Sequence, residues 1–363
     1  MFHRPLRGAI MRYRLLGKTG LRVSELCLGA MSFGEEWGWG ATKEESRRIF
    51  DAFLDAGGNF IDTANYYTNG TSEKYVGEFI AADRARIVLA TKYTLNTRPD
   101  DPNGGGNHRK NLVQSLEESL KRLRTEYVDL YWVHAWDPFT PVEETMRALD
   151  DAVRAGKVLY VGVSDTPAWV VSRANALAEL KGWSPFVGLQ IPYSLIERTP
   201  ERELLPMAEE LGMTVTAWGA LGGGVLTGKY ASREKRPPGS RYASAVEWGD
   251  MYLTERNLAI AAEVVRVAGE AGKTPSQTAI AWTRQRSPAV LPILGVSKLS
   301  QLKDNLGCLG FELTEEQMRR LDEASRVDIG FPLAFLEQVR EIIYGKTFPL
   351  IDDRQRRVVR KAA

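Results

Sequence analysis

The sequence predicts one closed (β/α)8 barrel, an α/β fold in which eight parallel strands stand inside a ring of helices. Short apolar segments alternate with helical segments along most of the 363 residues, and such alternation is typical of a parallel sheet covered by helices. The strand segments are apolar on both faces, as strands buried on both sides must be. Eight strand–helix units fit a closed barrel better than an open sheet, and no linker divides the chain.

The elements follow in a regular order. Residues 13–29 begin with two short apolar segments around Gly17 and Gly20, which predict an N-terminal β-hairpin. Barrel strands are expected at 26–29, 59–62, 87–92, 130–134, 160–164, 187–190, 215–218 and 289–294. Helices are expected at 41–58, 72–82, 109–123, 141–157, 167–182, 201–212, 255–272 and 300–307, with an extra C-terminal helix at 313–325. A long loop containing Gly and Pro is expected at about 219–253.

Two helix starts carry a capping signal. Thr42 with Glu45 three residues later, and Thr314 with Gln317, each match the capping-box pattern. Gly57 is expected to end the first of these helices.

The barrel is expected to occupy residues 12–330 as a single domain. Met11 precedes the first strand-like residues, so residues 1–11 are interpreted as a loose N-terminal arm. Residues 331–363 are interpreted as a C-terminal tail, with a lid over the substrate pocket as its role. The basic residues near the end of this tail are expected to be solvated rather than to form a binding site: Arg354, Arg356, Arg357, Arg360 and Lys361.

Composition excludes several classes of partner. The net charge is +2, from 48 basic and 46 acidic residues, so no general attraction to nucleic acid or membrane is expected. Cys27 and Cys308 make no disulfide framework and suit a reducing compartment. The N-terminus lacks the apolar core of a signal peptide and no segment reaches transmembrane length. The expected location is the cytoplasm; the oligomeric state stays open.

Polar residues stand where three successive strands end. Asp62, Lys92 and His134 each follow an apolar strand, and Tyr67 lies five residues after Asp62. In a (β/α)8 barrel the chemistry gathers at the carboxyl ends of the strands. Each residue alone could be explained by packing, but together they form a coherent acid–base set. An ammonium beside a phenol lowers its pKa, a buried ammonium needs a carboxylate, and His134 can donate to a carbonyl oxygen.

This set, in this order, resembles the aldo-keto reductases. The segments "FIDTANYYTNGTSE", "GVSD", "LQIPYSLIER" and "LGVSKLSQLKDNLG" carry the resemblance, which runs from about Tyr13 to Ser325. Tyr67 rather than Tyr66 matches the family tyrosine by its offset from Asp62. "GGNHRKNL" and "YVGVSDTPAWVVS" look like the aryl-alcohol dehydrogenase branch. The resemblance implies reversible reduction of aryl or bulky aldehydes and ketones by hydride transfer from NADP(H), with NAD(H) as an alternative cofactor and Tyr67 as the proton donor.

The resemblance also implies where the cofactor lies, across the barrel mouth without a Rossmann domain. No G-x-G-x-x-G motif opens an early strand–helix unit here. Ser164 and Gln190 would hold the carboxamide, and Trp218 would stack on the nicotinamide. Asp165 replaces a common Asn, and its charge would favour the oxidised cofactor. The pyrophosphate would lie along Leu221, Gly222, Gly223, Gly224 and Leu226. The remaining contacts would come from Gly295, Ser297 and Lys298 at the 2′-phosphate, and from Gln301 and Asn305 at the adenine.

The substrate pocket is expected to be aromatic. Trp37 and Trp39 lie among glycines after the first strand, and Trp136 follows His134. Phe331 or Phe335 could be added from the tail. Two other classes compete with this prediction. Some proteins similar to aldo-keto reductases are cofactor-binding regulatory subunits of channels with little turnover. A metal-dependent barrel hydrolase is less favoured, because His3, His108 and His134 are scattered, and no metal site is expected.

Overall fold

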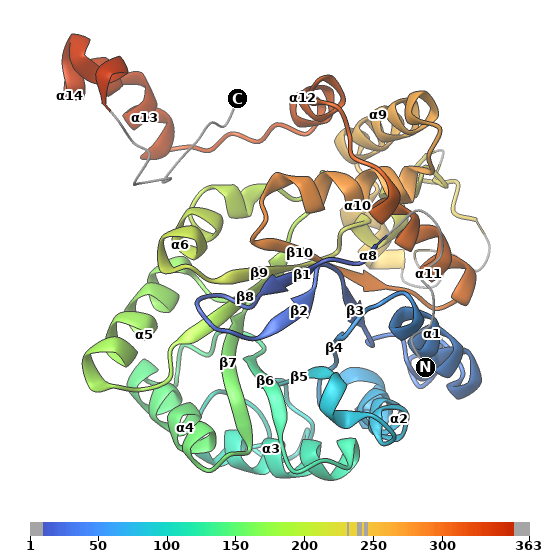
Figure 1. Cartoon of the computed structure of the whole chain (residues 1–363), viewed down its shortest axis with the longest axis vertical. Helices are drawn as coiled ribbons and strands as arrows, with labels where there is room; N and C mark the ends of the chain where they lie inside the picture. The colour runs from blue at the N-terminus through green and yellow to red at the C-terminus, as the bar shows by residue number, and fades with distance from the viewer. Residues whose placement is uncertain (1–9, 231, 238–241, 243–245, 352–363) are drawn as a thin grey trace.

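Eight parallel strands form a closed barrel, as the sequence predicts (Figure 1). The computed structural model describes residues 10–230, 232–237, 242 and 246–351. Around the barrel the order is β10-β3-β4-β5-β6-β7-β8-β9. The bounds are β3 Cys27–Gly29, β4 Phe60–Asp62, β5 Val88–Tyr93, β6 Val128–Val133, β7 Val158–Ser164, β8 Phe186–Pro192, β9 Thr214–Trp218 and β10 Val290–Gly295.

Helices surround the strands on the outside (Figure 1). Those that follow the barrel strands are α1 Lys43–Asp55, α2 Thr71–Ile80, α3 Arg109–Leu123, α4 Val142–Arg154, α5 Ala168–Lys181, α6 Leu204–Leu211, α9 Glu255–Ala271, α10 Pro275–Arg286 and α11 Leu299–Leu306. The extra helix α12, Glu315–Ala324, begins with the expected capping box between Thr314 and Gln317. Among the described residues no helix is long and apolar enough to cross a membrane.

The N-terminal hairpin closes the amino end of the barrel. Strands β1, Tyr13–Leu15, and β2, Arg22–Ser24, pair antiparallel and lie across the barrel centre in Figure 1. Leu16 and Val23 are fully buried and pack with the residues inside the barrel. The expected N-terminal arm, residues 1–11, does not include Met11, because Met11 is buried and packs in the core. Residues 1–9 of that arm lie outside the described residues.

The segment expected as a long loop contains two helical turns. The 3₁₀ helix η4, Gly222–Thr227, follows β9, and α8, Val246–Tyr252, precedes α9. Three successive glycines in η4 have left-handed φ values of 54°, 64° and 97°, which glycine adopts without strain. Side chains could not replace them all, since an added Cβ at Gly223 would overlap the phenol oxygen of Tyr242.

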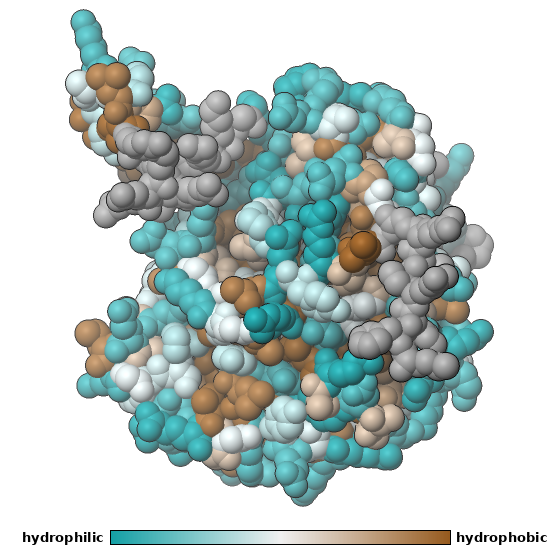
Figure 2. Space-filling view, in the orientation of Figure 1, coloured by the Kyte–Doolittle hydropathy of each residue, from teal (hydrophilic) through white to brown (hydrophobic). Residues whose placement is uncertain are grey.

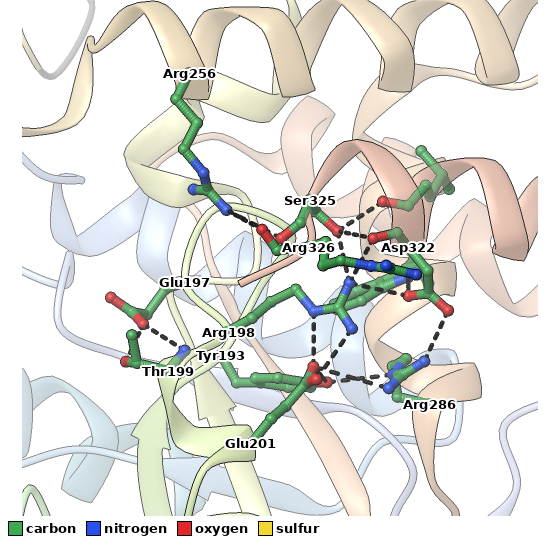
Figure 3. Close-up of polar contacts among 12 residues, drawn as sticks. Tyr193, Glu197, Arg198, Thr199, Glu201, Arg256, Arg286, Asp322, Ser325 and Arg326 are labelled. Carbon is green, nitrogen blue, oxygen red and sulfur yellow. Dashed lines mark hydrogen bonds and ion pairs between the residues drawn. The ribbon is translucent and has the colours of Figure 1, made fainter. Parts of the chain in front are cut away.

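A buried cluster joins the loop after β8 to α10 and α12 (Figure 3). Arg198 is 5% exposed and donates to Glu201 at 2.8 and 3.0 Å, to the carbonyl oxygen of Asp322 at 3.0 Å and to Ser325 Oγ at 2.8 Å. Arg286 of α10 pairs with Asp322 at 2.8 Å. We call these five residues the Arg198 cluster. Buried guanidinium groups need such partners, and here they fix the end of α12 to the barrel.

The tail leaves the barrel after this cluster. Its short helices α13, Leu333–Gln338, and α14, Arg340–Tyr344, followed by the 3₁₀ turn η6, Gly345–Leu350, project beyond the ring of helices (Figure 1), and apolar side chains cover much of their surface (Figure 2). The start of the tail meets the loops after β7 and β8 at a pocket lined in part by Pro167, Arg202 and Phe331. Residues 352–363, with their basic side chains, lie outside the described residues.

Candidate active site

The four residues of the predicted acid–base set meet at the carboxyl ends of β4, β5 and β6. Asp62 is the last residue of β4, Lys92 lies near the end of β5, and His134 directly follows β6. Tyr67 begins η1, Tyr67–Gly70, the short turn that follows β4. The sequence predicts Asp62, Lys92 and His134 from strand ends and Tyr67 from its offset from Asp62, and the structure brings all four side chains together.

Lys92 uses all three of its N–H donors. Its buried ammonium is ion-paired with Asp62 Oδ2, donates to the carbonyl oxygen of Thr63 at 2.8 Å and donates to Tyr67 Oη at 3.1 Å. An ammonium has three donors and no acceptor, so no further partner fits around it. Since Lys92 donates to the phenol oxygen, the proton of Tyr67 itself is directed elsewhere.

Burial and the neighbouring charges act in opposite directions on the pKa values of Lys92 and Tyr67, which form a hydrogen-bonded relay with Asp62. Burial alone would lower the pKa of Lys92, but Asp62 and Tyr67 together raise it above its ordinary value, so the ammonium stays charged. Burial raises the pKa of Tyr67 although Lys92 acts to lower it. The expectation that Lys92 would leave this phenol more acidic than usual is therefore wrong for the protein by itself, because desolvation outweighs the ammonium.

His134 is neutral at the pH of the cell. Burial, and then the nearby Lys92, hold its pKa well below the ordinary range. Its ring lies edge-on to Tyr67 with the centroids 5.8 Å apart, and Nδ1 is buried without a hydrogen-bond partner in the described structure. A neutral imidazole can donate one hydrogen bond without carrying charge, which suits it to orient a carbonyl oxygen beside the phenol.

The loop after β5 braces His134, a contact that no sequence pattern indicates. The backbone N–H of His134 donates to Thr94 Oγ1 at 3.2 Å, and Thr94 Oγ1 donates to Asn107 Oδ1 at 2.6 Å. Asn107 donates in turn to the carbonyl oxygen of Ala135 at 2.9 Å. Thr94 holds a left-handed φ of 97°, which is strained for a β-branched residue. Strain of this kind is not visible in a sequence.

The residues expected to hold a nicotinamide lie on the next three strands. Ser164, Gln190 and Trp218 stand at the carboxyl ends of β7, β8 and β9. Ser164 Oγ is buried and lies beside the Asp165 carboxylate, whose pKa it acts to lower. Trp218 Nε1 donates to Asp165 at 3.3 Å. Asp165 is exposed, but the protein around its carboxyl removes enough water to raise its pKa to about 6, although the Trp218 hydrogen bond acts to lower it.

At the turn expected to bind the pyrophosphate, several backbone N–H groups already have hydrogen-bond partners within the protein. Within and before η4, the N–H groups of Gly222, Gly224 and Leu226 already bond to carbonyl oxygens of the same turn, and the Leu226 side chain is fully buried. Leu221 caps the amino end of η4, and Gly223 holds the middle of the left-handed run.

Glu45 does not close its predicted capping box. Thr42 accepts from the Glu45 N–H, but the Glu45 carboxylate accepts from the Leu299 N–H of α11 at 2.6 Å instead. Helix α11 is the one expected to face a phosphate, after Gly295 at the end of β10. Lys298 caps it and is exposed.

Ser297 precedes α11, and Gln301 and Asn305 lie within it. The N–H of Ser297 donates to Gln301 at 2.9 Å. Gln301 is exposed, whereas Asn305 is 3% exposed. Of the pair expected at an adenine, Gln301 is therefore the accessible one.

Aromatic side chains line one side of the mouth. The ring of Trp37 lies 6.4 Å from Tyr67, edge-on, and 5.7 Å from Trp39. Trp136 is 41% exposed and packs edge-on against Trp169. The tail residues are not brought to this site: Phe331 and Phe335 are 84% and 51% exposed on the projecting tail. Among the described residues no group of His, Cys, Asp and Glu is placed to hold a metal ion.

A (β/α)8 barrel with a buried Asp–Lys–Tyr relay beside a neutral histidine is built for acid–base chemistry on a small molecule. Comparisons with known proteins agree. The sequence model of the Aldo/keto reductase family matches residues 25–326. The chain is 41% identical over 329 residues to a norsolorinic acid reductase of Emericella nidulans, covering 88% of this chain and 82% of that protein. It is 39% identical over 338 residues to a putative aryl-alcohol dehydrogenase of Saccharomyces cerevisiae, covering 90% and 89%. It is 38% identical over 337 residues to an aryl-alcohol dehydrogenase [NADP(+)] of Phanerodontia chrysosporium, covering 88% of each.

The chain belongs to the aldo/keto reductase family. Within it, the relatives include aryl-alcohol dehydrogenases, so the branch predicted from the sequence is confirmed. The protein is an oxidoreductase that acts on small carbonyl compounds with a nicotinamide cofactor.

Proposed function

We propose that the protein reduces aryl or bulky aldehydes and ketones with NADP(H), reversibly, and that Tyr67 is the proton donor. The Lys92 ammonium carries this proposal. Because it donates to Tyr67 Oη at 3.1 Å, the phenol proton is left for an oxygen that arrives at the mouth. The same hydrogen bond stabilises the phenolate once the proton has left.

Each of the four residues has its own role in the proposed reaction. The nicotinamide, when bound, supplies or accepts the hydride. Tyr67 gives its proton to the carbonyl oxygen as negative charge develops there, and neutral His134 donates a hydrogen bond that orients this oxygen. Asp62 keeps Lys92 charged in a buried position. In alcohol oxidation the phenolate of Tyr67 takes the proton back.

The cofactor assignment extends along the mouth. Ser164 and Gln190 would hold the carboxamide, and their position as direct neighbours in the β7–β8 register supports this assignment. Trp218 would stack on the nicotinamide ring, while the turn around Gly223 would follow the pyrophosphate. Lys298 would favour NADP(H) over NAD(H) through charge, although a lysine lacks the bidentate fork of arginine. A relative named for NADP(+) supports the same preference.

The substrate assignment is supported by the aromatic wall. Trp37 lies edge-on beside Tyr67 and packs against Trp39, and aromatic side chains at a pocket suit aromatic or polycyclic carbonyls. The names of two relatives, norsolorinic acid reductase and aryl-alcohol dehydrogenase [NADP(+)], support the same substrate class.

A substrate panel tests the proposal. NADPH absorbance would be followed with aryl aldehydes, aryl ketones, small aliphatic aldehydes and the matching alcohols. We expect the highest kcat/KM for aryl carbonyls and slower oxidation of the alcohols. Negligible NADPH consumption with every carbonyl, combined with tight cofactor binding, would instead favour a regulatory role. If small aliphatic aldehydes have the highest kcat/KM, the aromatic-pocket assignment is wrong.

A further inference from the structure

Gln190 and Asp62 are joined across the interior of the barrel. The Nε2 of Gln190, on β8, lies 3.0 Å from Oδ1 of Asp62, on β4. Both side chains are buried, at 3% and 2% exposure. A carboxylate can only accept, so the amide must turn one N–H toward Asp62. Gln190 was expected to serve the cofactor alone, and this contact gives it a second partner.

Gln190 thereby stands at one end of a continuous hydrogen-bonded chain. Gln190 donates to Asp62, Asp62 is paired with Lys92, and Lys92 donates to Tyr67. Each oxygen of Asp62 is held by a different strand, Oδ1 from β8 and Oδ2 from β5. Without Gln190, Oδ1 would lose this donor in a buried place, and the carboxylate charge would be balanced by Lys92 with less help.

We propose that Gln190 is a positioning residue for proton transfer by Tyr67: it holds Asp62, and through Asp62 it fixes how Lys92 is shared between carboxylate and phenol. This inference rests on the proposed role of Tyr67. Gln190 keeps a second N–H and its carbonyl oxygen, so it can bind an amide at the mouth while it holds Asp62. One side chain thus connects the carboxamide position to the proton relay.

The direction of the effect follows from the charges that face Tyr67. These are Lys92 from β5, Asp62 from β4 and Asp165 after β7; of them, Lys92 lowers the pKa of the phenol and the two carboxylates raise it. His134 after β6 is neutral. Loss of the Gln190 N–H leaves Asp62 less well compensated, so the pKa of Tyr67 should rise further and the phenolate should form at higher pH.

The test compares Gln190→Met with Thr216→Val. Thr216 is the direct neighbour of Gln190 in the β8–β9 register, and its buried Oγ1 has no hydrogen-bond partner, which makes it a matched control. Tyr67 is titrated without cofactor, as the difference in tyrosinate absorbance between each protein and its Tyr67→Phe form. The pH profile of alcohol oxidation and the cofactor Kd are measured beside it.

Gln190→Met should move the Tyr67 titration, and the limb of the oxidation profile that rises as Tyr67 loses its proton, to higher pH, and should lower kcat about tenfold. Thr216→Val should change none of these. Unchanged titration with a weakened cofactor Kd alone would overturn the proposal, because Gln190 would then serve the cofactor only. If Gln190→Met unfolds, Gln190→Glu takes its place: its protonated form can donate to Asp62, so the shift should appear only above the pKa of that glutamate.

The proposed function and this inference fail in distinguishable ways. A wild-type protein that binds no nicotinamide cofactor would refute the proposed function, whereas the cofactor-free titration would still report the link from Gln190 to Tyr67.

Discussion

Trp132 lies against Gly162 inside the barrel, where an added Cβ would overlap the indole ring. At Gly188, on the neighbouring strand, an added Cβ would stand 2.9 Å from the same ring. Trp132 is fully buried and is the direct neighbour of Lys92 in the β5–β6 register. Two glycines on β7 and β8 therefore make room for the residue that fills the barrel beside Lys92.

Gly162→Ala should overpack this interior. We expect a loss of about 1–3 kcal/mol in the free energy of unfolding, the usual result of an added methyl in a packed core, together with a lower kcat as Trp132 displaces Lys92. Chemical denaturation and steady-state kinetics would measure both effects. Gly269→Ala is the control, because an added Cβ in that part of α9 meets nothing within 4 Å. Equal stability of the two variants would contradict the packing argument.

Tyr67→Phe should reduce carbonyl reduction by about 10²-fold or more while the cofactor still binds, since a general acid is removed. Tyr66→Phe is the matched control, because Tyr66 is 41% exposed and has no described hydrogen bond to Lys92. The kcat values and the cofactor Kd of both variants decide the matter. Full activity in Tyr67→Phe with loss in Tyr66→Phe would reverse the assignment.

Lys298→Ala should weaken the preference for NADPH over NADH. The expected change is a several-fold rise in KM for NADPH with little change for NADH, because only the 2′-phosphate loses a charge partner. Lys303→Ala, an exposed lysine further along α11, controls for general charge. An unaltered ratio of the two KM values would mean that Lys298 points into solvent.

Asp165→Asn should make stability less dependent on pH. The pKa of Asp165 is raised to about 6 in the folded protein, above its ordinary value of about 3.9. A carboxyl with a raised folded pKa favours folding below the unfolded pKa and loses that contribution as pH rises through 6. Asparagine should therefore stabilise the protein above that pH, by at most about 1 kcal/mol at an open mouth, and have little effect near pH 4. Thermal unfolding at both pH values would check the sign, and an equal shift at both would contradict it.

Much of this arrangement is predictable from the chain alone, because strand ends and offsets are local features. Asp62, Lys92 and His134 follow apolar strands, and a parallel barrel must bring such positions together. Contacts across the barrel are different. The Gln190–Asp62 bond joins residues 128 apart, and no local pattern indicates it.

Competition between partners also escapes prediction. Glu45 matches the capping-box pattern, but its carboxylate accepts from the Leu299 N–H instead. A local sequence pattern contains no information on donors that are distant along the chain but near in space. Burial likewise raises the pKa of Tyr67, whereas the neighbouring Lys92 alone would be expected to lower it. The left-handed Thr94 that braces His134 could be found only from the backbone.

The Arg198 cluster marks a boundary within the chain. The family match ends at residue 326, one residue beyond Ser325, to which Arg198 donates. Because the chain is fastened there, a change in the length or sequence of the segment that follows would not be transmitted to the strand ends. The relay therefore does not depend on which segment follows residue 326, and replacing that tail with another should leave the proton relay undisturbed.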